Sequence, residues 1–226
     1  MSEVFDDRRQ AGRILSQQIS LTQSEKLNTI VLALPRGGVP VAFEIAEALQ
    51  LPLDVLIARK IGHPLYPEYG IGAITEDQKP WLDPEALGVA QLSEQQIETI
   101  IKNEKKEIWR RIEKYRYRKP LRSLKGKIVI LVDDGLATGG TARVAIGYIK
   151  SKEAKRIILA IPVGAQKAID DLKGQVDDVV CLNQSTSFLS VGRYYRDFKQ
   201  LSDHEVVELL NKIRFNRIDQ KLSLQF

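Results

Sequence analysis

Short, continuous runs of Val, Ile and Leu alternate along this chain with longer stretches in which apolar residues recur every three or four positions. The continuous runs are typical of strands that are buried on both faces, and the longer stretches are typical of helices that pack along one side. The alternation therefore predicts an α/β fold, with a doubly wound and mostly parallel sheet between layers of helices.

The pattern divides the chain into expected strands and helices. The expected strands are Thr29–Leu34, Leu53–Ala58, Gly72–Thr75, Ile128–Val132, Arg156–Pro162 and Asp178–Leu182. The expected helices are Asp6–Ser20, Val39–Leu49, Ser93–Arg118, Thr141–Lys152, Gln166–Lys173 and Asp203–Arg217. Ser93 is followed three residues later by Gln96, and Ser202 by Glu205, which is the spacing of a capping box at a helix start.

The strand–helix rhythm breaks at about residues 78–120, where a proline-containing loop leads into the long charged helix. We interpret this stretch as a helical insertion, or cap, on one domain that spans residues 1–226. The segment from Lys102 to Arg122 holds ten Lys or Arg and only three Glu, although the whole chain has a net charge of only +5. We expect a solvated helix face here. Tyr115 and Tyr117 interleave with Arg116 and Arg118, which leaves RNA or DNA binding open as the less favoured interpretation.

The segment VILVDDGLATGGT, residues 129–141, has the strongest chemical signature. An apolar strand ends in two carboxylates, Asp133 and Asp134, and a turn of small and hydroxyl-bearing residues leads into a helix. Glycines let backbone N–H groups approach a phosphate, and a helix N-terminus adds positive potential. Carboxylates accept hydrogen bonds from neutral hydroxyls such as a ribose diol. The combination predicts a site for ribose 5-phosphate.

This segment resembles the phosphoribosyl pyrophosphate (PRPP) motif of type I phosphoribosyltransferases. The resemblance implies that Asp133 and Asp134 bind the ribose 2′ and 3′ hydroxyls. It also implies that the turn holds the 5′-phosphate through Ala137, Thr138, Gly139, Gly140 and Thr141.

Two upstream segments resemble further parts of the same family. PRGGVP, residues 35–40, lies between a strand and a helix and resembles the pyrophosphate loop, which implies phosphate contacts from Arg36, Gly37 and Gly38. That loop often contains a non-proline cis peptide, which we expect at Arg36–Gly37. Arg59 and Lys60 end the next expected strand and lead into a loop, residues 62–70, that resembles the family's closing catalytic loop. Within that loop, His63 is either a surface residue or a pyrophosphate contact.

The resemblance implies displacement of pyrophosphate at ribose C1, with Arg36, Arg59 and Lys60 stabilising the leaving group. It also implies a homodimer and a Mg²⁺ ion that is held mainly by PRPP and water, near Asp133 and Asp134, rather than tightly by the protein. Members that act on 6-oxopurines usually carry Asp where this chain has Ala137, so hypoxanthine, guanine and xanthine are disfavoured as acceptors. Phe188, Tyr194 and Tyr195 either stack on a nucleobase-like acceptor or pack against the last helix.

A non-catalytic PRPP-sensing regulator is the main alternative, although the chain retains both the PRGG loop and the basic residues of the following segment. The polar N-terminus lacks a signal-peptide core, and the one cysteine, Cys181, lies in an apolar run, where it is expected to be a buried packing residue. No run of apolar residues is long enough for a membrane span. These features predict a cytoplasmic protein.

Overall fold

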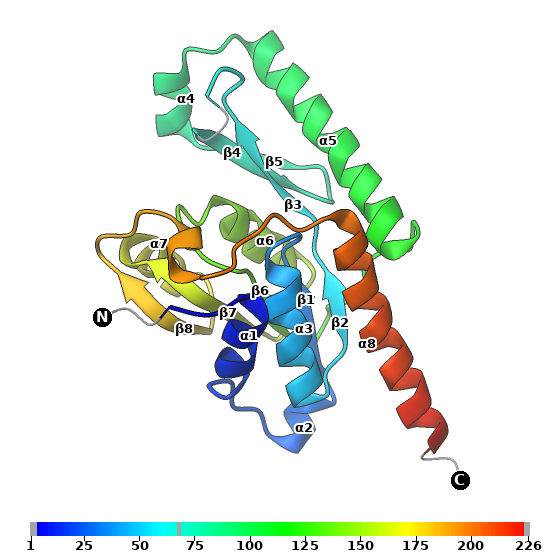
Figure 1. The fold of residues 1–226 in the computed structure, drawn as a ribbon. Helices are drawn as coiled ribbons and strands as arrows, with labels where there is room; N and C mark the ends of the chain where they lie inside the picture. Colours follow the sequence, from blue (N-terminus) through cyan, green and yellow to red (C-terminus); the bar gives the residue numbers. More distant parts are fainter. Residues whose placement is uncertain (1–3, 67–68, 224–226) are drawn as a thin grey trace.

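The structure, a computed structural model, describes residues 4–66 and 69–223, with side chains described as far as Arg214. Its main body is a five-stranded sheet in which every neighbouring pair of strands is parallel. A smaller, antiparallel three-stranded sheet lies above one end of this body (Figure 1). The main sheet confirms the predicted fold class, a doubly wound, mostly parallel α/β fold.

The order of strands in the main sheet is β2-β1-β6-β7-β8. The strands are β1 (Thr29–Ala33), β2 (Leu53–Val55), β6 (Ile128–Val132), β7 (Arg156–Ala165) and β8 (Asp178–Ser185). The helices that surround them are α1 (Arg8–Ser16), α2 (Gln23–Lys26), α3 (Gly38–Leu49), α6 (Gly140–Ser151), α7 (Gln166–Lys173) and α8 (Asp203–Ser223). A 3-10 turn, η1 (Val191–Tyr194), precedes the last helix.

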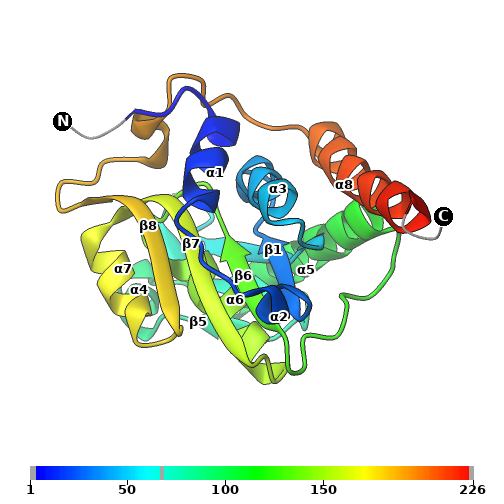
Figure 2. The same ribbon diagram turned by 90° about the horizontal axis from the view of Figure 1, so that it is seen from below.

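Alternate residues of the central strands enter two separate cores. Val31 and Ala33 of β1 pack with α1, α3 and α8, whereas Leu32 packs with α6 and α7 on the opposite face. Figure 2 shows α1 and α3 on one side of the sheet and α6 and α7 on the other. Burial on both faces explains why the central strands are continuous apolar runs rather than alternating ones.

We call residues 58–116, which form the smaller sheet and two helices, the hood. It consists of β3 (Ala58–Gly62), β4 (Gly70–Thr75), β5 (Pro80–Leu82), α4 (Pro84–Ala90) and α5 (Glu94–Arg116). The predicted strand Leu53–Ala58 is wrong as one element, because β2 ends at Val55 and β3 begins a different sheet at Ala58. The predicted strand Gly72–Thr75 is antiparallel and belongs to the hood.

The long helix α5 connects the hood to the main body. Its predicted apolar stripe is buried at its C-terminal end, where Ile108, Ile112 and Tyr115 join the core shared with α3 and α8. The capping boxes are confirmed: Ser93 and Gln96 exchange hydrogen bonds at the start of α5, and Ser202 and Glu205 do the same at the start of α8. No helix in the described part of the chain is both long and apolar enough to cross a membrane.

The packing of α1 on α3 depends on the absence of a side chain at Gly12. A Cβ atom there would lie 2.6 Å from the carbonyl oxygen of Val41. We expect Gly12→Ala to lower the free energy of unfolding by about 1–3 kcal/mol, because the two helices must separate. Gly147→Ala in α6 is the matched control, since nothing lies within 4 Å of the added atom. Alanine there should stabilise the helix by about 0.5–1 kcal/mol. Equal changes in urea unfolding for the two variants would contradict this account.

Candidate functional site

The order in which the chain adds strands across the main sheet reverses between β1 and β6. From β1 the chain passes through α3 to β2 on one side, and it later enters β6 on the other side. The loops that leave the carboxyl ends of β1 and β6 therefore separate in opposite directions and leave a crevice between them. The PRGG segment follows β1, and Asp133 and Asp134 follow β6, so both predicted motifs meet at this crevice.

These two loops are in close contact because two residues lack a side chain. A Cβ atom on Gly37 would lie 2.0 Å from Oδ2 of Asp134, and one on Gly38 would lie 2.6 Å from the carbonyl oxygen of Val132. The backbone N–H of Leu34 also donates to the carbonyl of Val132, at 2.8 Å. The non-proline cis peptide joins Pro35 to Arg36, so the prediction that placed it at Arg36–Gly37 is wrong by one bond.

Asp133 and Asp134, which we call the acid pair, are fixed by contacts with several segments of the chain. Nε of Arg8 lies 2.7 Å from Oδ2 of Asp134, and the hydroxyl of Tyr195 donates to the backbone carbonyl of Asp134 at 2.6 Å. The backbone N–H of Asp134 donates to Oδ1 of Asp133 at 2.9 Å. Burial, together with the neighbouring Asp134 carboxylate, raises the pKa of Asp133 well above its ordinary value. Asp133 thus needs neutralising or hydrogen-bonding partners in the crevice.

The turn after the acid pair presents its backbone at the start of α6. Ala137 and Thr138 are exposed, and Gly139 has a φ of +76°, in the left-handed region that favours glycine. Leu136 fastens the near side of the turn by hydrogen bonds to the backbone of Val163 and Ala165. Helix α6 begins at Gly140, so its first N–H groups, without intrahelical acceptors, lie beside Thr138 and Thr141. This arrangement suits an anion.

A cavity of about 350 Å³ opens between the main body and the hood at this crevice. Four guanidinium-bearing residues line it together with Asp134; the four are Arg8, Arg36, Arg59 and Arg111. They come from α1, the PRGG loop, β3 and α5, so that separate segments of the chain converge on one space. Their concentration makes the cavity suitable for a ligand that carries several negative charges.

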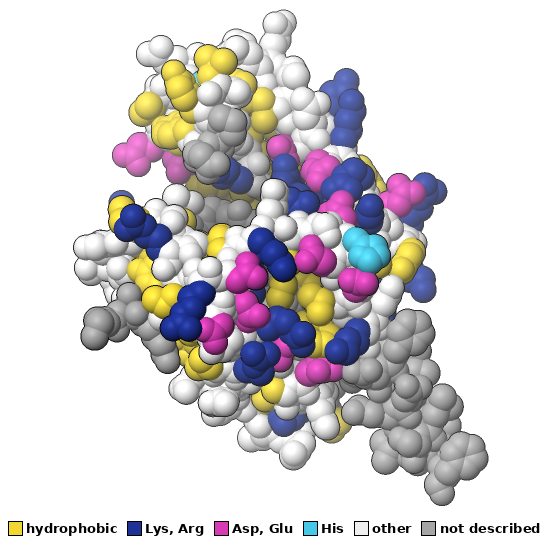
Figure 3. Space-filling model, viewed as in Figure 1, with side chains coloured by type: hydrophobic (Ala, Val, Ile, Leu, Met, Phe, Trp, Pro, Cys, Tyr) yellow, Lys and Arg dark blue, Asp and Glu magenta, His cyan; other side chains and the backbone are white. Residues whose placement is uncertain are grey.

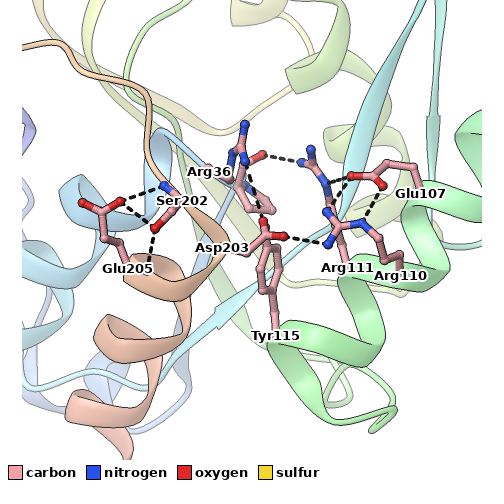
Figure 4. Close-up of polar contacts among 9 residues, drawn as sticks. Arg36, Glu107, Arg110, Arg111, Tyr115, Ser202, Asp203 and Glu205 are labelled. Atoms are coloured by element: carbon pink, nitrogen blue, oxygen red, sulfur yellow. Dashed lines mark hydrogen bonds and ion pairs between the residues drawn. The ribbon is translucent and has the colours of Figure 1, made fainter.

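A network of charged groups joins the PRGG loop to α5 and α8 (Figure 4). Nη1 of Arg36 lies 3.8 Å from Oδ1 of Asp203, which also accepts a hydrogen bond from the hydroxyl of Tyr115. Nη1 of Arg110 lies 2.6 Å from the other oxygen of Asp203. Burial alone would raise the pKa of Asp203, but the hydrogen bonds from Arg110 and Tyr115 bring it below its ordinary value.

The same network includes a second carboxylate, on α5. Glu107 accepts hydrogen bonds from Arg110 and Arg111, and they lower its pKa to about 2. Arg111 also donates to the carbonyl oxygen of Pro35 at 3.3 Å, which connects the hood directly to the PRGG loop (Figure 4). The guanidinium groups are thereby held in place before any ligand arrives.

Arg59 and Lys60 lie within β3 and not, as predicted, at the end of a core strand. Arg59 faces the cavity, and its Nε lies 2.7 Å from Oε2 of Glu104 on α5. Lys60 follows it in the strand and so points to the other face of the hood sheet. His63 is buried: its Nδ1 accepts hydrogen bonds from the backbone of Leu65 and Tyr66. His63 is therefore not a surface residue, and it shapes the β3–β4 connection from within.

The aromatic stretch near residue 190 lies over the same end of the sheet. Phe188 and Tyr194 stack on each other, with ring centroids 5.5 Å apart, and Tyr194 is buried. Tyr195 is also buried and stacks on Phe198. These rings therefore pack among themselves rather than against α8, and Tyr195 also contacts Asp134. Cys181 is half-buried in β8, and burial raises the pKa of its thiol to about 12.

Sequence reasoning missed Arg8, Arg111 and Asp203 as parts of this site. Each lies far along the chain from the predicted motifs, and each belongs to a helix whose charges are typical of a solvated surface. For Asp203 there was one signal, since the capping box at Ser202 places it in the first turn of α8. Nothing local to Arg8 or Arg111 indicates that it faces the crevice.

Comparison with known proteins gives concordant results. A family model described as "Phosphoribosyl transferase domain" matches residues 2–199. "Putative phosphoribosyl transferase" proteins from two strains of Mycobacterium tuberculosis are 40% identical over 210 residues, which covers 93% of this chain and 47% of theirs. The chain thus spans about half the length of these curated relatives. A crystal structure of TT1426 from Thermus thermophilus has a TM-score of 0.73 and 36% identity, and covers 92% of this chain and 97% of that one.

The raised pKa of Asp133 predicts a cost in stability. The pKa of Asp133 is higher in the folded state than in the unfolded state. At a pH between these two pKa values the folded state binds more protons than the unfolded state, so the free energy of unfolding falls as the pH rises through this range. We expect Asp133→Asn to have a higher Tm than the wild type at pH 8, with the difference shrinking toward pH 4. Asp171→Asn, at an exposed position, is the control and should follow the wild type. A Tm difference that is constant with pH would contradict the assignment.

Proposed function

Because the chain belongs to the phosphoribosyl transferase domain family, we propose that it is an enzyme that binds PRPP and transfers its phosphoribosyl group. In this reaction a nucleobase-like nitrogen nucleophile replaces pyrophosphate at ribose C1. One observation carries the proposal: Asp134 lines a cavity with a cluster of guanidinium groups, and the chain continues from it directly into a helix-start turn suited to phosphate. PRPP carries, in order, the groups that these three parts would bind.

Binding of the phosphoribosyl group would use the two sides of the β6 turn differently. Backbone N–H groups and the hydroxyls of Thr138 and Thr141 donate to the 5′-phosphate, and the small side chain of Ala137 leaves the backbone accessible. Asp133 and Asp134 accept hydrogen bonds from the ribose hydroxyls. Each hydrogen bond to a charged partner contributes about 1.5–3 kcal/mol, so a few such bonds are enough to orient the ribose.

Pyrophosphate, the leaving group, would lie against the PRGG loop. Arg36, Arg59 and Arg111 line the cavity together with Gly37, whereas Gly38 is buried against the end of β6. These cations would stabilise the charge that develops on pyrophosphate as the bond to C1 breaks. Lys60 faces away from this cavity in the structure, so a contact with pyrophosphate would require the β3–β4 hairpin to rearrange.

The acid pair also fits a Mg²⁺ ion that arrives with the substrate. Asp133 and Asp134 are adjacent, and no group of three or more His, Cys, Asp or Glu in the described part of the chain could hold a metal ion. Mg²⁺ commonly binds through one or two carboxylates together with substrate phosphates and water. When bound, it would neutralise charge on the pyrophosphate.

The acceptor would enter beside the stretch that contains Phe188 and Tyr195, because the hydroxyl of Tyr195 contacts the backbone of Asp134. Phe188 is half-buried and would offer the aromatic surface, whereas Tyr194 is buried. Ala137 lacks the carboxylate that favours 6-oxopurines in the related enzymes, so we propose a different nitrogen nucleophile. By the same resemblance we propose that the protein acts in the cytoplasm as a homodimer.

Replacement of Arg36 tests the proposal that the PRGG loop binds pyrophosphate. We expect the protein to bind PRPP with Mg²⁺ at least about tenfold more tightly than ribose 5-phosphate, and Arg36→Ala to remove most of this difference. Because Arg36 is partly exposed in a loop, its replacement should change the Tm little. Arg13→Ala, on the exposed side of α1, is the matched control. Calorimetry that finds equal affinities for the two ligands in the wild type would refute the assignment.

Release of pyrophosphate would distinguish an enzyme from a protein that binds PRPP without reaction. We expect release of pyrophosphate from PRPP and Mg²⁺ when nucleobases are supplied one at a time, with hypoxanthine, guanine and xanthine poorer than the best acceptor, because Ala137 provides no carboxylate to them. A coupled pyrophosphate assay measures this. Tight PRPP binding without pyrophosphate release for any nucleobase would instead support the non-catalytic alternative.

A further inference from the structure

A second cavity, of about 480 Å³, lies beneath the C-terminal end of α5 and is lined by cations. Its charged lining residues are five cations, Arg116, Arg118, Lys119, Arg122 and Lys152, and a single carboxylate, Glu76. Arg118 is already paired with Glu113, whereas Lys119 and Arg122 form no ion pair with any carboxylate in the described part of the chain. The cavity lining therefore carries more cations than carboxylates, and the buried carboxylate of Asp54, which interacts with Arg116 and Arg122 from outside the lining, offsets only part of that charge.

The clearest sign that the cavity lacks hydrogen-bond acceptors is the side chain of Arg116. Its side chain is only 2% exposed and pairs with Glu76 through Nη2. Its other two nitrogens, Nε and Nη1, are buried and have no hydrogen-bond acceptor among the described residues. Buried guanidinium N–H groups are costly to leave unpaired, and native structures seldom do so. An anion in the cavity would supply the missing acceptors.

The cavity is separate from the crevice between the loops after β1 and β6, where we propose that PRPP binds and which we call the PRPP crevice. Arg111 faces the crevice, whereas Ile112, the next residue of α5, lines the second cavity, so the helix lies between the two spaces. Glu76 also accepts a hydrogen bond from the backbone N–H of Ile57, where the chain crosses from the main body into the hood. The cavity therefore lies at the junction of these two parts.

The face opposite in character to this cavity is the one made by α1, α3 and α8, where charges of opposite sign are mixed. On this face, Lys and Arg side chains lie among Asp and Glu around a few apolar ones (Figure 3). The groove on that face is lined by acidic and basic residues in equal number. The one-sided charge of the α5 cavity is thus not shared by the groove on that face.

We propose that the α5 cavity is a second ligand site, which binds an oligophosphate. Its volume lies within the range of small-molecule sites. Arg116 would bind one phosphate deep in the cavity, and Lys119, Arg122 and Lys152 would contact the others at its rim. The phosphate chain belongs equally to an inorganic polyphosphate or a nucleoside triphosphate. The ring of Tyr148, together with the indole of Trp109, which is 56% exposed, would add contacts for a base.

Inorganic tripolyphosphate and ATP are the two probes, titrated by calorimetry at low ionic strength. We expect the double variant Lys119→Ala/Arg122→Ala to bind tripolyphosphate at least about tenfold more weakly at this site than the wild type. Lys102→Ala/Lys106→Ala removes the same charge from exposed positions of α5 outside the cavity, and its affinity should stay within about twofold. Tighter binding of ATP than of tripolyphosphate would identify a nucleotide as the ligand; equal binding would identify the phosphate chain alone.

Trp109 reports where the ligand binds. With Trp81→Phe as background, Trp109 is the only tryptophan, and its fluorescence should change on titration. Arg36→Ala should retain this response and Lys119→Ala/Arg122→Ala should lose it, whether or not PRPP binds elsewhere. The reverse pattern would assign the anion to the PRPP crevice and overturn the inference. Absence of binding to the wild type, or equal weakening by both lysine-containing double variants, would also overturn it.

Discussion

The close approach of the loops after β1 and β6 is the constraint on which the rest of the site depends. A methyl group at Gly37 or Gly38 would overlap the Asp134 carboxylate or the β6 backbone, so the two strands can present their loops together only with glycine at these positions. Because β1 and β6 are neighbours in the parallel sheet, their carboxyl ends are already at the same edge. The sheet brings the loops together, and the glycines allow the contact.

Electrostatics then connects the site to parts of the chain that have no role in the sheet itself. Arg8 holds Asp134 from α1, Arg59 is paired with Glu104, and Arg36 lies near Asp203. A pyrophosphate group entering the crevice would compete with Glu104 and Asp203 for the same guanidinium groups. In the free protein these carboxylates reduce the cost of keeping several cations close together. Ligand binding would exchange them for phosphate oxygens.

The hood completes the cavity from above, and this was the part that sequence reasoning described least well. The prediction treated Leu53–Ala58 as one core strand because five of its six residues are apolar. In the structure β2 ends at Val55 and β3 begins at Ala58, on either side of the boundary between the main body and the hood, and all six residues of the run are buried. Apolar periodicity reports burial but not which sheet buries a residue. For the same reason, the sequence placed Arg59 and Lys60 together, whereas strand alternation directs them to opposite faces.

The amino-acid sequence by itself determined the features that depend on local chemistry: the positions of the core strands, the caps of α5 and α8, the glycine-rich loops and the carboxylate pair that ends β6. Each is encoded within a few consecutive residues, where backbone geometry and hydrogen bonding limit the alternatives. Only the tertiary structure decided which distant charges complete the site, such as Arg8, Arg111 and Asp203, and that Arg116, the last residue of α5, is buried. A long polar side chain on a helix has the same local sequence signal whether it meets water or another segment, because its partner is chosen by packing between elements far apart in the chain.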